Sequence, residues 1–380
     1  MRLTTLLLAL LLFTFRVAPA ASPIAEALKP FVEKGELAGA VALIASKDKM
    51  LAVEAVGFAD RATQRPMKAD ALFWIASQSK PITAVAVMML VDEGKLKLDD
   101  AVEKYLPEFK GQQLEVKDAT GKTALKTPAH PITVREVLNH TSGLPFKSAA
   151  EQPTLDGLPL RDAVASYAKT PLTFEPGTKY TYSNAGINTA ARLIEVLTGQ
   201  SYEAFMDARL FKPLGMKYTT FWPSKEQLTR LATPHKPNAA KTGLETTTIS
   251  QLRYPLYDRA KRFPMPAGGL FATASDCAKF CQMLLNGGEL GGKRYLSAAA
   301  FKELTTRQTP ATLKESYGLG FSVGSGGFGH GGALATNMNI DPTRGFVTVW
   351  LVQHAGYPGE GGKAQGAFRK AAEEQFAKKP

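Results

Sequence analysis

The sequence is poor in the residues that build disulfides and metal sites. It has only two cysteines, Cys277 and Cys281, in 380 residues. They are four residues apart on a predicted helix, where their side chains run roughly parallel, a poor geometry for a disulfide. We therefore expect free, buried thiols. The five histidines form neither a helical pair nor a His-Glu-x-x-His motif, so no metal is expected. Residues 324–329 match a dinucleotide fingerprint, but no predicted helix follows them, so no cofactor is expected either.

The chain also lacks a hydrophobic run long enough to cross a bilayer. Its N-terminal apolar run, residues 6–13, falls far short of the ~20 residues that a transmembrane helix needs. Arg2 precedes this run, and the small-residue stretch Ala18-Pro19-Ala20 follows it. This order is typical of a secretory signal with its cleavage site. The sequence therefore predicts a signal peptide over residues 1–20 and a secreted or periplasmic protein without a transmembrane span.

Blocks of like charge are missing as well. The formal net charge is +12, but the lysines and arginines are dispersed along the chain. Because they form neither a basic cluster with interleaved aromatics nor a known nucleic-acid module, nucleic acid is not an expected partner. Association with an anionic cell envelope remains compatible with this charge.

The most informative stretch that is present runs over residues 73–94. Ser77 stands just ahead of a predicted helix, and Lys80 follows one turn later. Residues 81–91 are almost wholly apolar, which is typical of a buried helix. Burial and the positive helix N-terminus both lower the pKa of a lysine at this position. A neutral lysine can take the proton of a serine hydroxyl, so this pair is a candidate nucleophile with its base.

Ser-x-x-Lys is a short pattern, and it occurs three times in this chain. Ser46 and Lys49 belong to a polar turn between two predicted strands, and Ser166 and Lys169 lie at the end of a short predicted helix. Only the Ser77 copy opens a buried helix. Ser322 matches the Gly-x-Ser-x-Gly pattern, but no helix follows it, so we interpret it as a strand residue.

Two further segments carry groups that a serine–lysine site needs. In the extended segment Tyr182-Ser183-Asn184, residues i and i+2 point the same way. The phenol of Tyr182 is suited to relay protons and the amide of Asn184 to hold a substrate carbonyl. In the second segment, Gly331 and Gly332 permit a close approach of the backbone. The N–H groups of Ser77 and Ala333 are then candidates for an oxyanion hole. His330 has three candidate roles: it binds a substrate carboxylate, it orients Tyr182, or it is purely structural.

The order of predicted elements indicates a sheet domain interrupted by helices. Strands are expected over residues 38–46, 50–58, 319–323, 333–340 and 346–353, and helices over residues 24–32, 133–138, 187–197, 201–210, 276–285 and 362–377. A hairpin turn at residues 341–345 would pair Ala333 near Gln353 and Gly332 near His354, which brings His354 to the catalytic edge. We predict a sheet domain from residues 24–75 and 265–380, and a mainly helical insertion over residues 76–264.

In these motifs the chain resembles the class C β-lactamase-related serine hydrolases, which include D-alanyl-D-alanine carboxypeptidases and family VIII esterases. The resemblance rests on the segment from Phe73 to Lys80, His140-Thr141-Ser142-Gly143-Leu144-Pro145, Tyr182-Ser183-Asn184, Gly268-Gly269-Leu270 and His330-Gly331-Gly332. It implies an α+β, β-lactamase/transpeptidase-like fold, with an antiparallel five-stranded sheet flanked by helices and an inserted mainly helical domain.

The resemblance also shows departures. His330 and Gly331 stand where the β-lactamases have the lysine and threonine that help bind the antibiotic's carboxylate, and Lys147 replaces a glutamine. We therefore expect an exported serine hydrolase that acts on an ester, an amide or a D-amino-acid peptide. Two alternatives stay open: a true β-lactamase, and a penicillin- or peptidoglycan-binding protein without turnover. The sequence does not decide whether Lys80 or Tyr182 is the base, and it leaves Lys147 and His354 as candidate supporting residues.

Overall fold

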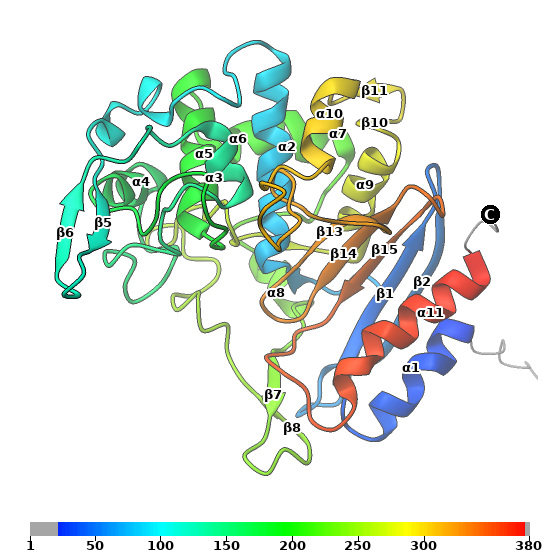
Figure 1. The fold of residues 1–380 in the computed structure, drawn as a ribbon. Helices are drawn as coiled ribbons and strands as arrows, with labels where there is room; N and C mark the ends of the chain where they lie inside the picture. Colours follow the sequence, from blue (N-terminus) through cyan, green and yellow to red (C-terminus); the bar gives the residue numbers. More distant parts are fainter. Residues whose placement is uncertain (1–21, 377–380) are drawn as a thin grey trace, which may run out of the picture.

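A single antiparallel sheet forms the centre of the computed structural model, which describes residues 22–376 (Figure 1). The strand order is β12-β13-β14-β15-β1-β2-β3. Their bounds are β1 Gly39–Ala45, β2 Met50–Asp60, β3 Arg65–Pro66, β12 Ser322–Gly324, β13 Gly327–Gly331, β14 Asn337–Asp341 and β15 Phe346–Leu351. The predicted antiparallel sheet flanked by helices is confirmed. Its strand count of five is corrected to seven, because β13 and the short edge strand β3 were not among the expected strands.

The central strand β1 is buried along its whole length, because helices cover both faces of the sheet. Alternate residues of a strand point to opposite faces. Val41 and Leu43 accordingly join the large core beneath the helical part of the chain, whereas Ala42 and Ile44 join a second core. The two terminal helices, α1 (Pro23–Glu33) and α11 (Ala364–Phe376), pack together over this second core (Figure 1).

On the face of the sheet opposite α1 and α11 lies the helical part of the chain, which includes the helix that begins next to Ser77. This helix, α2 (Ser79–Asp92), is buried from Ser79 to Leu90, in agreement with the all-round apolar sequence. It packs against α5 (Asn184–Thr198) and α10 (Ala298–Thr305), while α9 (Ala274–Leu285) packs on β1, β14 and β15 of the sheet. Residues 76–264 supply most of the remaining helices. The predicted division into two domains stays a prediction, and the predicted signal peptide lies outside the described residues.

The other elements are short. They are α3 Val134–Asn139, α4 Leu160–Ala168, α6 Tyr202–Met206, α7 Lys212–Leu214, α8 Lys225–Thr229, the π-helical turn Asp207–Phe211, and the 3-10 turns Ala76–Gln78, Val102–Lys104, Pro107–Phe109 and Gly361–Lys363. Two-stranded ribbons pair β4 Phe73–Trp74 with β9 Phe271–Ala272, β5 Leu114–Lys117 with β6 Thr123–Lys126, β7 His235–Pro237 with β8 Leu244–Thr246, and β10 Glu289–Leu290 with β11 Lys293–Arg294. No helix within residues 22–376 is both long enough and apolar enough to cross a membrane.

The sequence-based prediction was wrong in the region of β13 and β14. The strand expected over residues 333–340 begins at Asn337, and β13 was not predicted at all. Glycine has a low strand propensity, and β13 has glycines at 327, 329 and 331. The strand forms by pairing with β14. The two strands lie so close together that a Cβ at Gly329 would collide with the carbonyl of Met338, which explains the glycine there. The expected pairing of Gly332 with His354 also fails, because the ladder ends where Asn337 pairs with Trp350.

Candidate functional site

Ser77 lies in the 3-10 turn Ala76–Gln78 that leads directly into α2. Ala76 adopts a left-handed conformation, with φ +48°, although it is neither glycine nor exposed. Such a conformation is unfavourable for alanine and persists only where the surroundings impose it. The turn leaves the Ser77 side chain partly exposed while Lys80, one turn later, is completely buried. The Nζ atom of Lys80 lies 3.1 Å from Ser77 Oγ.

The other partners of Lys80 allow it to meet Ser77 as a neutral amine. Nζ donates to Asn184 Oδ1 at 2.7 Å and to the carbonyl oxygen of Ala267 at 2.8 Å. Both oxygens can only accept, and a neutral amine has two N–H donors and one lone pair. In the neutral form both protons go to these oxygens and the lone pair is left for Ser77 Oγ, whereas in the ammonium form the third N–H donates to Ser77 Oγ. Burial lowers the pKa of Lys80 well below its ordinary value, which favours this neutral form.

Tyr182 reaches the same place from the loop before α5. Ser183, the N-cap of α5, fixes this loop by donating to the carbonyl oxygen of Pro145 at 2.7 Å and by accepting from Gly186 N. Lys80 Nζ lies 4.5 Å from the centroid of the Tyr182 ring. Burial raises the pKa of Tyr182 above its ordinary value, and a hydrogen bond with Ser77 only partly opposes this. The phenol is therefore protonated at neutral pH, which makes it a proton donor rather than a base.

The glycine-rich end of β13 closes the site from the sheet. A Cβ at Gly332 would lie 2.5 Å from the carbonyl oxygen of Ile75 and would overlap Thr336 Oγ1. Gly332 N donates to the carbonyl oxygen of Thr336 within the following turn. The N–H groups of Ser77 and Ala333 have no protein acceptor among residues 22–376, so both can donate to a bound oxyanion. Gly331, the last residue of β13, is exposed at this edge.

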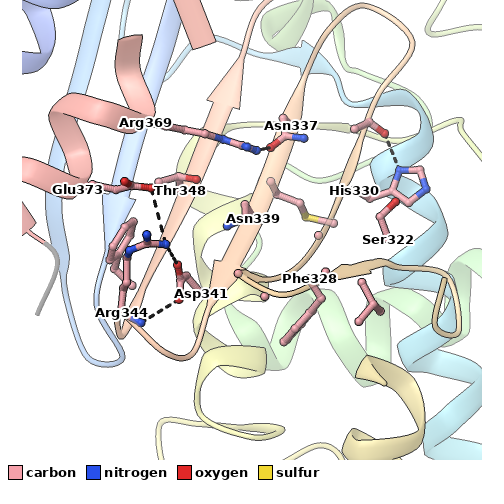
Figure 2. Close-up of a pocket in the computed structure, with 18 residues that line it drawn as sticks. Ser322, Phe328, His330, Asn337, Asn339, Asp341, Arg344, Thr348, Arg369 and Glu373 are labelled. Atoms are coloured by element: carbon pink, nitrogen blue, oxygen red, sulfur yellow. Dashed lines mark hydrogen bonds and ion pairs between the residues drawn. The ribbon is translucent and has the colours of Figure 1, made fainter. Parts of the chain in front are cut away.

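His330 is held by two hydrogen bonds. Nδ1 lies 2.6 Å from the carbonyl oxygen of Gly331, a contact drawn in Figure 2, and Nε2 lies 2.9 Å from the hydroxyl of Tyr317. Burial, together with the nearby Lys80, lowers the pKa of His330 to about 3. His330 is therefore neutral and has no free N–H, so it is not arranged to bind a substrate carboxylate. Its ring centroid is 6.0 Å from that of Tyr182, without a hydrogen bond between the two.

The two candidate supporting residues, Lys147 and His354, do not contact Ser77, Lys80 or Tyr182 in the described structure. His354 Nε2 accepts from Ala38 N at 3.1 Å, and its ring stacks on Tyr357. Its backbone N–H donates to the carbonyl oxygen of Leu334 at 3.0 Å, so His354 lies beside the segment that follows Gly332, although not in the expected pairing with Gly332, and its supporting role stays a prediction. Lys147 is half-buried beside Glu151, whose pKa it helps to lower against the stronger opposing effect of burial.

Sequence reasoning assigned no role to three residues that hold the site together. Ala267 supplies an acceptor for Lys80, and its own N–H donates to Asn188 Oδ1 at 3.0 Å. Tyr317 and His140 lie behind Tyr182, with centroid separations of 4.9 Å between Tyr317 and His140 and 4.6 Å between His140 and Tyr182. The motif from His140 to Pro145 contains one of these residues, and the Gly268-Gly269-Leu270 motif begins directly after Ala267, but neither motif showed their purpose. Nothing in the sequence singled out Tyr317.

A hollow of about 400 Å³ lies on the α11 side of the sheet, away from the Lys80 side (Figure 2). Asn337, Asn339 and Thr348 of β14 and β15 line it, and Arg369 of α11 donates to Asn337 Oδ1 at its rim. His330 and Gly331 border both this hollow and the site, but Ser77, Lys80, Tyr182 and Asn184 do not line the hollow. We therefore place the candidate active site at Ser77 and not in this hollow.

The comparisons with known proteins agree with this fold. Residues 24–372 match the Beta-lactamase family, and the chain belongs to this family of serine hydrolases. It is similar to the esterase EstB of Burkholderia gladioli, with 33% identity over 61% of this chain and 60% of that protein. It is also similar to penicillin-binding protein 4 of Amycolatopsis lactamdurans, with 30% identity over 78% of this chain and 76% of that protein. Among solved structures, EstCE1, a hydrolase with promiscuous acyltransferase activity, matches with a TM-score of 0.74 and 24% identity over 92% of this chain and 97% of that one.

Proposed function

We propose that this protein is an exported serine esterase that forms an acyl-enzyme on Ser77. The observation that carries the proposal is the completely buried Lys80 amine, 3.1 Å from Ser77 Oγ, with its other two partners restricted to accepting hydrogen bonds. A serine hydroxyl is a weak nucleophile until a nearby base takes its proton. Lys80 is that base, and the resemblance to EstB supports an ester substrate.

The reaction proceeds in two stages. Lys80 takes the proton of Ser77 as Oγ attacks the carbonyl carbon, and the N–H groups of Ser77 and Ala333 hold the developing oxyanion. Tyr182 then gives its phenolic proton to the leaving oxygen and is reprotonated from Lys80. In the second stage a water molecule attacks the acyl-enzyme with the same base, and Ser77 is released. The amide NH₂ of Asn184 has no acceptor within the described part of the chain, so it is free to hold the substrate.

The state of His330 favours esters without a free carboxylate. D-alanyl-D-alanine peptides and β-lactams both carry a carboxylate, which a cationic or free N–H donor must bind. His330 is neutral and both of its ring nitrogens are engaged. We therefore rank a neutral ester above a D-amino-acid peptide or an antibiotic as the substrate.

A substrate panel tests this proposal. p-Nitrophenyl butyrate, nitrocefin and an acyl-D-alanyl-D-alanine peptide would be compared, together with the same peptide capped as its C-terminal amide. We expect multiple turnovers of the butyrate at a kcat/KM at least 100-fold above the values for nitrocefin and the free-acid peptide. Faster turnover of the free-acid peptide than of its amide would instead identify a carboxypeptidase. A single acylation without turnover on every substrate would identify a binding protein, as the similarity to penicillin-binding protein 4 suggests.

The export proposal rests on the N-terminal sequence. The full chain would be expressed in a Gram-negative host, and the purified protein from each cell fraction would be analysed by intact mass. We expect the protein to be periplasmic or envelope-associated and to begin at Ala21. A cytoplasmic protein that retains residues 1–20 would contradict the proposal.

A further inference from the structure

Three buried side chains form a hydrogen-bonded row behind Tyr182. The hydroxyl of Tyr317 lies 2.9 Å from His330 Nε2 and 3.3 Å from His140 Nε2. His140 packs its ring against Tyr182, and all three members of the row are almost completely shielded from solvent. The mechanism proposed above uses none of these three side chains as an acid, a base or a donor to the substrate.

The backbone groups at the two ends fix the direction of every bond in the row. At one end Ser183 N–H donates to His140 Nδ1 at 3.2 Å, so Nδ1 bears no proton and the neutral ring carries its proton on Nε2. At the other end the carbonyl of Gly331 can only accept, so His330 carries its proton on Nδ1 and accepts at Nε2. Tyr317 therefore accepts from His140 and donates to His330.

Both ends of the row are peptide groups within two residues of a group proposed to take part in the reaction at Ser77. Ser183 follows Tyr182, the proposed proton donor, and Gly331 lies two residues before Ala333, a proposed oxyanion donor. The row thus connects the loop before α5 to the end of β13 across the back of the site. These segments are separated by about 150 residues of sequence, and Tyr317 is the group that both histidines share.

We propose that Tyr317 is a positioning residue that holds Tyr182 and the oxyanion edge in register through the row Ser183–His140–Tyr317–His330–Gly331. This rests on the proposed function of Ser77. The row works only when both histidines are neutral, because a protonated His140 cannot accept from Ser183 and a protonated His330 cannot accept from Tyr317. Burial and the proximity of Lys80 lower the pKa of both histidines, which agrees with this requirement.

The tautomers provide a test that does not depend on activity. The mature chain would be labelled with ¹⁵N-histidine, and the ring nitrogens of His140 and His330 would be assigned by NMR with single His→Gln variants. We expect the proton on Nε2 of His140 and on Nδ1 of His330, with neither ring titrating between pH 8 and pH 5. The opposite tautomer at either ring, or titration of either ring near pH 6.5, would overturn the proposal.

Kinetics of Tyr317→Phe test the consequence for catalysis. This variant keeps the ring but leaves His330 Nε2 without its donor. We expect kcat on p-nitrophenyl butyrate to fall at least tenfold while KM changes less than twofold, at a temperature where the variant is fully folded. The matched control is Tyr180→Phe, because the Tyr180 ring also packs against His140 and Tyr317 but its hydroxyl has no hydrogen bond in the described structure. This control should keep kcat within twofold.

The outcomes separate the two proposals. An active wild type with an unaffected Tyr317→Phe, or with the wrong tautomers, would contradict the positioning role and leave the esterase intact. A wild type with the expected tautomers but without hydrolysis of any substrate would contradict the proposed function, and the positioning role that rests on it would fall too.

Discussion

At the scale of single residues, the reactivity of Ser77 depends on the Lys80 amine, which must be able to lose its proton near neutral pH. Lys80 has this property because burial removes its hydration and its remaining contacts are two neutral oxygen acceptors. The phenol of Tyr182 is shifted the opposite way by the same burial, towards the protonated form. One buried environment thus produces a base and an acid side by side, which a serine hydrolase needs within a single turnover.

Replacing Lys80 separates its role as a base from its role as a hydrogen-bond donor. Arginine keeps the charge and the donors but cannot lose a proton in this pH range, and methionine keeps the length without either function. We expect kcat/KM on p-nitrophenyl butyrate to fall about 10²–10⁴-fold in both variants, the range for loss of a general base. Lys169→Arg, in a second Ser-x-x-Lys copy at the end of α4, is the control and should leave kcat/KM unchanged. Near-normal activity in folded Lys80→Arg would show that another group is the base.

The pH dependence of kcat/KM follows from the same two shifts. Lys80 is active when neutral, so the rate should rise with pH through a pKa below its ordinary value of 10.5. Tyr182 is active when protonated, and because burial raises its pKa above 10.0, the rate should not decline near pH 10. A pH–rate profile of the wild-type enzyme between pH 5 and pH 10 checks both limbs. A decline that begins below pH 10, or a rate that still increases tenfold per pH unit up to pH 10, would contradict this assignment of acid and base.

At the scale of elements, the site exists where the start of α2 meets the end of β13. The contact needs a side-chain-free residue, because the carbonyl of Ile75 and the hydroxyl of Thr336 occupy the space of a Cβ at Gly332. Thr336 in turn donates to that carbonyl at 3.3 Å, so the turn after β13 and the turn before α2 are joined by two kinds of contact.

Substituting Gly332 tests this contact. In Gly332→Ala, β13 and the Ala76–Gln78 turn must move apart, which displaces Ala333 from Ser77. We expect at least a 100-fold loss in kcat/KM on the butyrate, since a shift of about 1 Å can cost this factor. Gly326→Ala is the matched control, because its Cβ would meet nothing within 4 Å and the backbone there is not left-handed. Equal activities of these two variants would show that close packing at Gly332 does not matter.

At the scale of the whole molecule, burial of neutral histidines makes stability depend on pH. Burial lowers the pKa of both His330 and His354 to about 3, from an ordinary value of 6.5. Below pH 6.5 these histidines become protonated in the unfolded chain but stay neutral in the folded chain. The free energy of unfolding should therefore fall between pH 6.5 and pH 3, by up to about 1.4 kcal/mol per pH unit for each histidine.

Urea unfolding at pH 7, 6, 5 and 4 measures this slope. His354→Gln removes one of the two groups at a distance from Ser77, and the glutamine amide oxygen can take the place of Nε2 and still accept from Ala38 N. We expect a smaller loss of stability with acid in this variant and unchanged kcat/KM at pH 7. A slope identical to that of the wild type would show that His354 is not held neutral by the fold.

The sequence predicted those parts of the molecule that depend on local patterns. The buried helix after Ser77, the hairpin β1–β2 and the Thr133 cap of α3 each have a short signal, namely an apolar run, two strand-like runs around a polar turn, and a capping residue. Cys277 and Cys281 are free and buried, as their spacing predicted. The helix expected over residues 276–285 begins two residues earlier, at Ala274, because Thr273 is its N-cap.

The features that escaped prediction depend on contacts between distant segments. Strand β13 is rich in glycine and is stabilised by its neighbour rather than by its own residues. Ala267 reaches Lys80 across 187 residues, and Tyr317 reaches His140 across 177, so no spacing within one element reveals them. Tyr182 and Asn184 were found because a two-residue spacing brought both to the same side of an extended segment.

The most direct measurement of the central claim is the site of covalent labelling by a fluorophosphonate, mapped by peptide mass spectrometry. We predict one adduct, on Ser77, that forms in the wild type, is abolished in Ser77→Ala, slows in Lys80→Met and is unchanged in Ser322→Ala. An adduct on Ser322 or on any residue other than Ser77, with hydrolysis retained in Ser77→Ala, would contradict it.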